Sequence, residues 1–523
     1  MRSSFVQFGL GALLALGSVG CNDYLRGTGL SGDPNNPSPT DATIDELFVA
    51  AQTSLAGQLT GELARASCMY TQQCAGTDRQ YQAIGTYVVD ASVFASSFDR
   101  FYTGGGLVDL RNIETKARNA ATPDSIHLGI ALVMEAWMIG TAADLWGDIP
   151  YSEAADPFTH PTPTYDNQLS VYAALQTVLD DAIKALNGST GVGPGANDLV
   201  YGGKVAKWKQ LAHQLKARYY LHVAEANGPA NYASALAEAN QGISTAANDY
   251  LTYQSSATTE GNFWYQFQIV QRDSYLRMGK RLVDLMVTRN DPRLDAYFDK
   301  TATAAWAAAK KYTVGARILD SNNNVEQATA VTLDSLSGAT QPTWATTVGA
   351  TTTDNHVTWT NKGVPWGGAD PGQQLNPATM SNLKGCGADG ASGTRCGPDF
   401  RQPLATHAEN QLIIAETAYR TSDETTARDS LNSERVAAGL LAVPGTVTGA
   451  ALLDSIMTEK YVVTFQSIEA WSDYKRTCIP ALVPATGYTQ VIGRLPYSVN
   501  EVNTNPNVPS PEPARNRNDP NAC

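Results

Sequence analysis

Along most of this chain, apolar positions recur three and four residues apart, the spacing that places them on one face of a helix. The segment 42–68 has this pattern, with Asp41 as its expected N-cap. The spacing also predicts a helix over 98–120, interrupted at Gly104–Gly106, and one over 167–188 that ends on Gly188. Further helices are expected over 124–146, 203–228, 231–244, 274–300, 407–420, 424–440 and 449–476.

Short turns rich in glycine and proline separate these helices, which is the rhythm of helical-repeat proteins. The pairs resemble tetratricopeptide hairpins, with alanine and aromatic residues where two helices meet, although no strict repeat of about 34 residues is visible. Such a pair buries its apolar face only against its neighbours. The helical block is therefore expected to be, first of all, a scaffold.

Residues 251–400 break this pattern, because they are rich in Thr, Ser, Asn, Gly and Trp. Apart from the helix at 274–300, this part is expected to form loops and short strands. The proline-rich tail, 505–523, is expected to be extended and loosely held. We therefore expect a mostly α single domain over 41–523, with a loop-rich insertion at about 251–400.

The N-terminus has the pattern of a secretory signal peptide over 1–20. Arg2 precedes an apolar stretch, 5–19, and a small residue stands directly before Cys21. The end of this segment resembles a bacterial lipoprotein signal, although Ser18 departs from the usual branched aliphatic residue. Cys21 is the expected lipid anchor; the alternative is an ordinary cleaved signal with a chance cysteine.

The segment after the predicted anchor, 21–40, is rich in Gly, Pro, Asn and Ser and predicts a flexible tether. No apolar run beyond the signal is expected to span a membrane. The 523 residues carry 50 acidic against 37 basic side chains, a net charge of -13. Without a basic stripe to neutralise phosphates, a nucleic-acid partner is not expected.

Besides Cys21 the chain has an even number of cysteines, which in an exported protein favours disulfides. They lie in local pairs, and we expect Cys68–Cys74, Cys386–Cys396 and Cys478–Cys523 to be bonded. The last bridge would attach the tail to the domain. Zinc is the competing interpretation, but these spacings are wider than the two-residue gap of common zinc motifs.

No catalytic motif is present: there is no zinc helix, nucleophile elbow, phosphate loop or dinucleotide fingerprint, and the six histidines are scattered. Carboxylates are too numerous for counting to exclude a glycoside hydrolase. The stretch "DSNNNVE", 320–326, alternates oxygen ligands as a calcium loop does, but lacks the central glycine and the distal bidentate Glu. Calcium and a plain polar loop both stay open there; no other cofactor or metal is expected.

Six segments, in order along the chain, resemble motifs of the SusD/RagB family of outer-membrane lipoproteins, and fit its shorter-motif branch best. The resemblance covers about residues 21–507 and is weakest over 312–400. The segments are "LWGDIPYSEA" (145–154), "LKARYYLHVAE" (215–225), "NDPRLDAYF" (290–298), "NQLIIAETAYR" (410–420), "EKYVVTFQSIEAWSDYKRTCIPAL" (459–482) and "RLPYSVNEVNTNPN" (494–507).

The resemblance implies a tetratricopeptide-like helix-pair scaffold with an irregular ligand-binding region. It also implies a non-catalytic lipoprotein of the outer membrane, facing the cell exterior, that captures an oligosaccharide or peptide. The implied partner is a TonB-dependent (SusC-like) transporter, and the membrane is reached through the lipid anchor only. Two alternatives stay open: a helical-repeat adaptor that binds protein, and a surface glycan hydrolase.

We interpret two of these motifs as structural turns. In the first, Trp146 closes a helix into the core, while Asp148, Pro150 and Tyr151 fix a tight corner. In the second, Asp291 and Arg293 are expected to form an ion pair that holds a loop. Ligand contacts should therefore come from elsewhere in the chain.

Aromatic rings in the irregular segments are the candidate ligand contacts, because sugars stack their apolar faces on exposed rings. Trp366, between Pro365 and Gly367, is expected to be the most exposed of them. The alternative is that the rings only anchor loops on the helices. The candidates are Tyr81, Trp264, Tyr265, Phe267, Trp344, Trp359 and Trp366.

Overall fold

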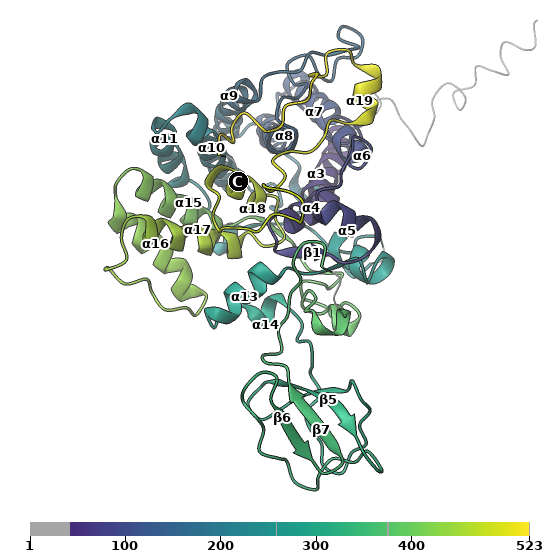
Figure 1. Cartoon of the computed structure of the whole chain (residues 1–523). Coiled ribbons are helices and arrows are strands. Elements are labelled where there is room, and N and C mark those ends of the chain that lie inside the picture. The colour runs from purple at the N-terminus through teal and green to yellow at the C-terminus, as the bar shows by residue number, and fades with distance from the viewer. Residues whose placement is uncertain (1–41, 258, 374–375, 522) are drawn as a thin grey trace, which may run out of the picture.

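The computed structural model describes residues 42–257, 259–373, 376–521 and 523. The predicted signal peptide, tether and lipid-anchor Cys21 lie outside these residues. Figure 1 shows a helical body from which a small β-structured lobe extends on two neighbouring chain segments.

The body is built from helices that pack pairwise along the chain. α8 packs on α7 and α9, α10 on α9 and α11, and α15 on α11, α16 and α17. The fold is thus the mostly α, tetratricopeptide-like helix-pair scaffold that the sequence predicts. The longer helices are α3 (Ile44–Thr60), α4 (Glu62–Tyr70), α7 (Leu107–Asn119), α8 (Ser125–Trp146), α9 (Gln168–Gly188), α10 (Val205–Asn227), α11 (Ala230–Ala239), α13 (Lys280–Thr288), α15 (His407–Arg420), α16 (Glu424–Ala437), α17 (Ala450–Val463) and α18 (Glu469–Thr477).

Shorter elements join the helix pairs. The short helices are α5 (Arg79–Gly85), α6 (Ala95–Asp99), α12 (Phe263–Tyr265), α14 (Leu294–Tyr297) and α19 (Val499–Thr504), with single turns η1 (Gly195–Asn197), η2 (Ala246–Asn248), η4 (Pro377–Thr379) and η5 (Cys386–Ala388) and a π-helix η3 (Gln266–Gln271). Two small antiparallel sheets pair β1 (Cys74–Gly76) with β3 (Leu276–Met278) and β2 (Tyr250–Leu251) with β8 (Pro403–Ala405).

Local chemistry sets the helix ends, and some differ from the prediction. The N-cap of α3 is Thr43, whose hydroxyl accepts from Glu46 N while Glu46 reaches back to Thr43 N. Asp41, the predicted cap, lies outside the described residues. The predicted helix 42–68 breaks at Gly61, where a Cβ would lie 2.5 Å from the carbonyl oxygen of Gly57.

Two other predicted helices are also divided. The segment 449–476 forms α17 and α18, separated by a turn in which Gln466 has a φ of 69°. The segment 274–300 forms β3, α13 and α14, because its first residues pair with β1 and Pro292 follows α13. The periodicity of apolar residues does not predict these breaks, because strand pairing and turns in the folded chain cause them.

The core of the body runs from Leu47 to Tyr497, with α8 near its centre. α8 is the one described helix that is long and apolar enough to cross a membrane, which the sequence analysis did not anticipate. However, 89% of its apolar window is buried in the fold. It is thus a core helix, with almost every side chain beyond its first turn packed against its neighbours.

A group of buried charged residues joins α8, α10, α15, α17 and α18, and we call it the buried ion network. Arg476 Nη2 donates to Glu416 Oε2 (2.6 Å), and Arg218 donates to Glu409 (2.8 Å, Nη2 to Oε2). His222 lies between two carboxylates, 3.0 Å from Asp144 and 3.0 Å from Glu469. The network comprises Asp144, Arg218, His222, Glu409, Glu416, Lys460, Glu469, Asp473 and Arg476.

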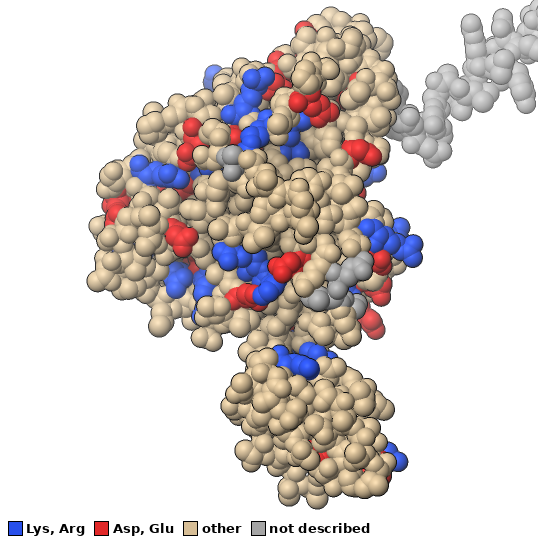
Figure 2. All heavy atoms as spheres, viewed as in Figure 1, with Lys and Arg blue, Asp and Glu red and all other residues tan. Residues whose placement is uncertain are grey.

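Residues 302–364 form the β lobe. Its neck is closed by a hydrogen bond from Thr301 N to the carbonyl of Pro365 (2.9 Å). The lobe contains one antiparallel sheet in the order β4 (Arg317–Leu319), β5 (Val325–Val331), β7 (Val357–Asn361), β6 (Thr351–Asp354). It has a hydrophobic core of its own, and Figure 2 shows few charged side chains on the visible face.

All three predicted disulfides are present: Cys68–Cys74, Cys386–Cys396 and Cys478–Cys523. The tail is not loosely held, which corrects the prediction. Asn516, Asn518 and Asp519 are buried, and Asn516 Nδ2 donates to the carbonyl of Asp144. Hydrogen bonds to α8 and its following turn, as well as the disulfide, therefore hold the tail in place.

The two motifs interpreted as turns have that role. Trp146 is fully buried and its Nε1 donates to Pro496 O (2.9 Å), while Asp148 accepts from Gln168 N (2.9 Å). The predicted ion pair is also present, because Arg293 donates through two nitrogens to Asp291 (2.8 and 2.7 Å). Both motifs are scaffold.

Candidate functional site

A groove in the helical body is the best candidate for a binding site. It has a volume of about 750 Å³ and is bounded by α3, α4, α6 and the start of α12. We call it the α3–α6 groove. Its lining residues are Ala50, Thr53, Ser54, Gly57, Gln58, Gly61, Glu62, Arg65, Ser96, Ser97, Arg100, Thr103, Gly104 and Phe263.

The walls of the groove are polar and fixed by hydrogen bonds between helices. Gln58 Nε2 on α3 donates to the carbonyl of Ser97 (2.6 Å), and the Ser97 hydroxyl donates to Glu62 Oε2 (3.1 Å). These contacts attach the short helix α6 to α3 and α4. Arg100 is exposed at the rim, so two guanidinium groups, a carboxylate, the amide of Gln58 and several hydroxyls line one concave surface.

Arg65 is held at the groove by two aromatic residues that the sequence analysis selected. Its Nε donates to the hydroxyl of Tyr81 (2.8 Å), and its guanidinium carbon lies 4.2 Å above the ring centre of Phe267. The Tyr81 and Phe267 rings are themselves 4.6 Å apart. Burial raises the pKa of Tyr81, which keeps the hydroxyl neutral and able to accept. Tyr81 and Phe267 are buried, so they position Arg65.

Phe263 provides the exposed ring of the groove, with 39% of its surface accessible. It begins α12, where the side chain of Asn262 accepts from Trp264 N (2.8 Å). The ring lies over Gly57, and a Cβ at position 57 would lie 3.4 Å from it. The π-helix η3 follows directly; such helices occur often at functional sites.

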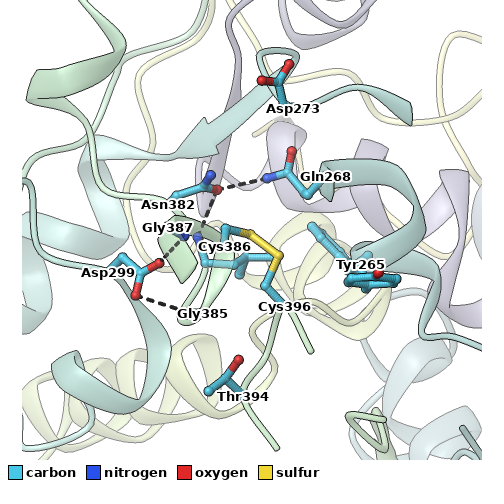
Figure 3. The surroundings of a disulfide bond; sticks show 12 residues. Tyr265, Gln268, Asp273, Asp299, Asn382, Gly385, Cys386, Gly387, Thr394 and Cys396 are labelled. Atoms are coloured by element: carbon cyan, nitrogen blue, oxygen red, sulfur yellow. Dashed lines mark hydrogen bonds between the residues drawn. A yellow bond between two sulfur atoms is a disulfide. The ribbon is translucent and has the colours of Figure 1, made fainter. Parts of the chain in front are cut away.

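The other predicted contacts in this segment lie away from the groove. Trp264, the middle residue of α12, is fully buried, so it has no face to offer a ligand. Tyr265 is partly buried and packs against Gly390, where a Cβ would lie 2.5 Å from its ring. Figure 3 shows Tyr265 beside the Cys386–Cys396 disulfide.

The three remaining predicted contacts belong to the lobe and its neck. Trp359 is fully buried and Trp344 is 5% exposed; their rings pack in the lobe core at 6.1 Å between centres. Trp366, expected to be the most exposed, is partly buried at the neck, with Lys300 Nζ 5.6 Å from its ring centre. The structure does not bring these rings to the groove. The prediction that Trp264, Trp344 and Trp359 are exposed is wrong because each completes a core.

Sequence reasoning missed Phe263, Arg65, Gln58, Glu62 and Arg100. A signal for Phe263 was available in the helical spacing of its own segment. Trp264, Phe267 and Gln268 stand at i, i+3 and i+4 and are all buried, whereas Phe263 and Val270 face outward. Arg65 and Glu62 carried no such signal, because only the packing of α6 on α3 and α4 makes them a wall.

One group of described residues has metal-ligand types in close proximity, Asp144, His222 and Glu469. Burial by itself lowers the pKa of His222, but the two carboxylates raise it to about 10. The imidazole is therefore protonated at neutral pH, and each ring nitrogen lies 3.0 Å from a carboxylate oxygen. This arrangement is an ion-paired part of the scaffold, and it offers no free imidazole nitrogen to a metal.

Comparison with known proteins identifies the family. A family model described as "Starch-binding associating with outer membrane", SusD-like_2, matches residues 34–498. The chain belongs to the SusD-like family. No curated protein sequence matches this SusD-like chain significantly.

Solved structures agree in fold. A chitin-binding protein has a TM-score of 0.66 at 19% identity, covering 92% of this chain and 100% of its own. A chitin-binding SusD homologue from Flavobacterium johnsoniae has a TM-score of 0.64 at 16% identity, covering 92% and 99%. A SusD/RagB family protein from Bacteroides thetaiotaomicron VPI-5482 has a TM-score of 0.62 at 18% identity, covering 90% and 95%.

Proposed function

We propose that this SusD-like protein binds a glycan in the α3–α6 groove at the cell surface. The observation that carries the proposal is the composition of the groove: one exposed ring, Phe263, lies among hydroxyls, one amide and charged groups, several of them fixed by hydrogen bonds. A sugar needs this combination, because its apolar face stacks on a ring while its hydroxyls exchange hydrogen bonds. The chitin-binding structures of similar fold support a glycan over a peptide.

The wider role we propose is capture and delivery. The protein would be held at the outer membrane by lipid on Cys21, face the cell exterior, and pass its ligand to a TonB-dependent transporter. The lipoprotein-like signal and the outer-membrane description of the family support this proposal. Extraction from the native outer membrane in mild detergent should recover a large β-barrel protein in near-equal amount; recovery of the protein alone would count against delivery.

We further propose that the groove does not hydrolyse its ligand. Glu62 is the only carboxylate among the described residues that line it, whereas glycosidases use two. Glu114 and Glu135 do share a hydrogen bond, but both are buried between α7 and α8. Burial, and after it the neighbouring Glu135, raises the pKa of Glu114 to about 9, and neither residue lines the groove. Products released on long incubation would overturn the non-catalytic assignment.

The groove is tested by removing its ring. Phe263→Ala should weaken binding of a chitin or starch oligosaccharide by roughly tenfold, since a stacking ring contributes about 1–2 kcal/mol. Phe158→Ala is the matched control, because Phe158 is 98% exposed and does not line the groove. Isothermal titration calorimetry measures both. An equal loss of affinity in the two variants, or no loss in Phe263→Ala, would show that the ligand does not bind in the groove. Binding of peptides in place of glycans would redirect the ligand class.

A further inference from the structure

Glu326 in the β lobe is a buried carboxyl group that forms no ion pair with any described residue. Its side chain lies in β5, and none of the residue's surface is accessible. Both carboxylate oxygens are buried and neither has a hydrogen-bond partner among the described residues. A buried charge is ordinarily paired or bound to a metal, because desolvation of a lone carboxylate is costly.

Strand register places a second carboxylate near it. Glu326 pairs with Ile318 on β4 and with Asn361 on β7, so all three side chains lie on one face of the sheet. Asp320 follows Ile318 by two positions and therefore lies on that same face, diagonal to Glu326. Burial, and after it the charge of Asp320, raises the pKa of Glu326 to about 7, with Asn361 and Lys362 lowering it in part.

The turn between β4 and β5 is preorganised around Asp320. One carboxylate oxygen accepts from Asn322 N (2.8 Å) and Asn324 N (2.7 Å), and the other accepts only from Asn322 Nδ2 at 3.3 Å. Asn361 donates to Ala345 O (2.6 Å) and accepts from Gly363 N (2.8 Å). The second Asp320 oxygen and both Glu326 oxygens thus have the capacity to accept further.

We propose that Glu326 and Asp320 bind a calcium ion that joins the β4–β5 turn to the sheet of the lobe. The ligand set is all oxygen, as hard cations require, and two carboxylates supply the charge; water and carbonyl oxygens would fill the remaining positions. Imidazole and thiolate ligands for transition metals do not take part. The site lies in a different part of the molecule from the α3–α6 groove, so it stands or falls separately from the proposed glycan binding.

Terbium luminescence tests the site, because Tb³⁺ occupies calcium sites and emits when a nearby tryptophan is excited. Trp359 precedes Asn361 by two residues on β7 and lies in the same lobe core. After treatment with EDTA, the full chain should show saturable Tb³⁺ emission that Ca²⁺ abolishes. Glu326→Gln should weaken Tb³⁺ binding by roughly tenfold or more, through loss of one charged ligand.

The matched control is Asp334→Asn, which removes another acid of the lobe, one that is half-exposed and paired with His356 (2.6 Å). It should bind Tb³⁺ as the unaltered protein does. A second measurement does not depend on a variant: Ca²⁺ should raise the melting temperature and slow proteolysis within 302–364. Absence of saturable emission, equal emission from Glu326→Gln, or no effect of Ca²⁺ on the lobe would overturn the proposal.

Discussion

The helical body and the β lobe treat buried charge in opposite ways. In the body, Arg476, Glu416 and Lys460 are buried together with their partners, so each carboxylate faces a cation. In the lobe, Glu326 is buried without one. The buried ion network of the body is therefore self-sufficient in charge, whereas Glu326 of the lobe needs a proton or a cation from outside. The two regions should respond to different perturbations, and four predictions test this difference.

Removal of one partner from the buried ion network should have the largest effect. Arg476→Met leaves Glu416 with Lys460 alone in the core, and we expect the free energy of unfolding to fall by about 3–5 kcal/mol. Urea denaturation followed by far-UV circular dichroism measures this. The control Lys280→Met breaks an ion pair with Asp284 in which both side chains are about half exposed, and it should cost about 1 kcal/mol or less. Similar losses of unfolding free energy in the two variants would mean that the buried network is no more important to stability than an exposed ion pair.

Loss of a core ring in the lobe should be comparably large but local. Trp359→Ala removes the ring that packs on Tyr312 and Trp344, at a cost of about 3–5 kcal/mol to the lobe. Limited proteolysis should then cleave within 302–364 while the helical body stays resistant and binds glycan unchanged. Trp264→Ala, in the core of the body, is the comparison, and it should expose the body itself to cleavage. Loss of glycan binding in Trp359→Ala would mean that the two regions are coupled.

The contrast also explains what the sequence predicts well. Helices such as α8 and α10 are predicted because their apolar periodicity is the same property that buries them. β5, in contrast, reads "VEQATAV", and the polar Glu326 stands where the alternation of a half-buried strand requires an apolar residue. The sequence thus predicts short strands in this region but does not show which of their residues are buried.

The groove was only partly predictable, for a different reason. Two of the selected aromatic residues, Tyr81 and Phe267, contact Arg65 of the groove, but whether a ring faces outward is decided by tertiary packing. Trp264 and Phe263 are neighbours in the chain, yet Trp264 is fully buried and Phe263 is 39% exposed. Arg65 becomes part of the site only because Tyr81 and Phe267, distant in sequence, hold it. The types of residue determine the chemistry of a site, but the packing of helices and strands determines which residues form it.

In the body, pH should act through His222. Its pKa in the folded protein, about 10, is above the ordinary value of 6.5, so the folded state holds a proton that the unfolded chain loses. This stabilisation is complete below pH 6.5 and is lost as the pH rises to about 10. The urea midpoint should fall across that window. His222→Gln should be less stable at pH 6.5, with the difference narrowing towards pH 10; a constant difference would contradict the assignment.

In the lobe, pH should act through Glu326, with a smaller shift and in a lower window. Without calcium, the folded pKa of about 7 exceeds the ordinary 4.5, so the unfolded chain releases its proton first as the pH rises. Stability of the lobe should therefore decrease between pH 4.5 and 7 and then level off.

A variant separates the buried acid from the cation. In EDTA at pH 8, Glu326→Gln should resist proteolysis within 302–364 better than the unaltered protein, because the neutral amide places no charge in the core of the lobe. Asp334→Asn, at a half-exposed pair, should change little. With calcium present the unaltered protein should be the more resistant of the two, since its carboxylate then has a cation. If Glu326→Gln were the more resistant protein both in EDTA and in calcium, Glu326 would not bind a cation.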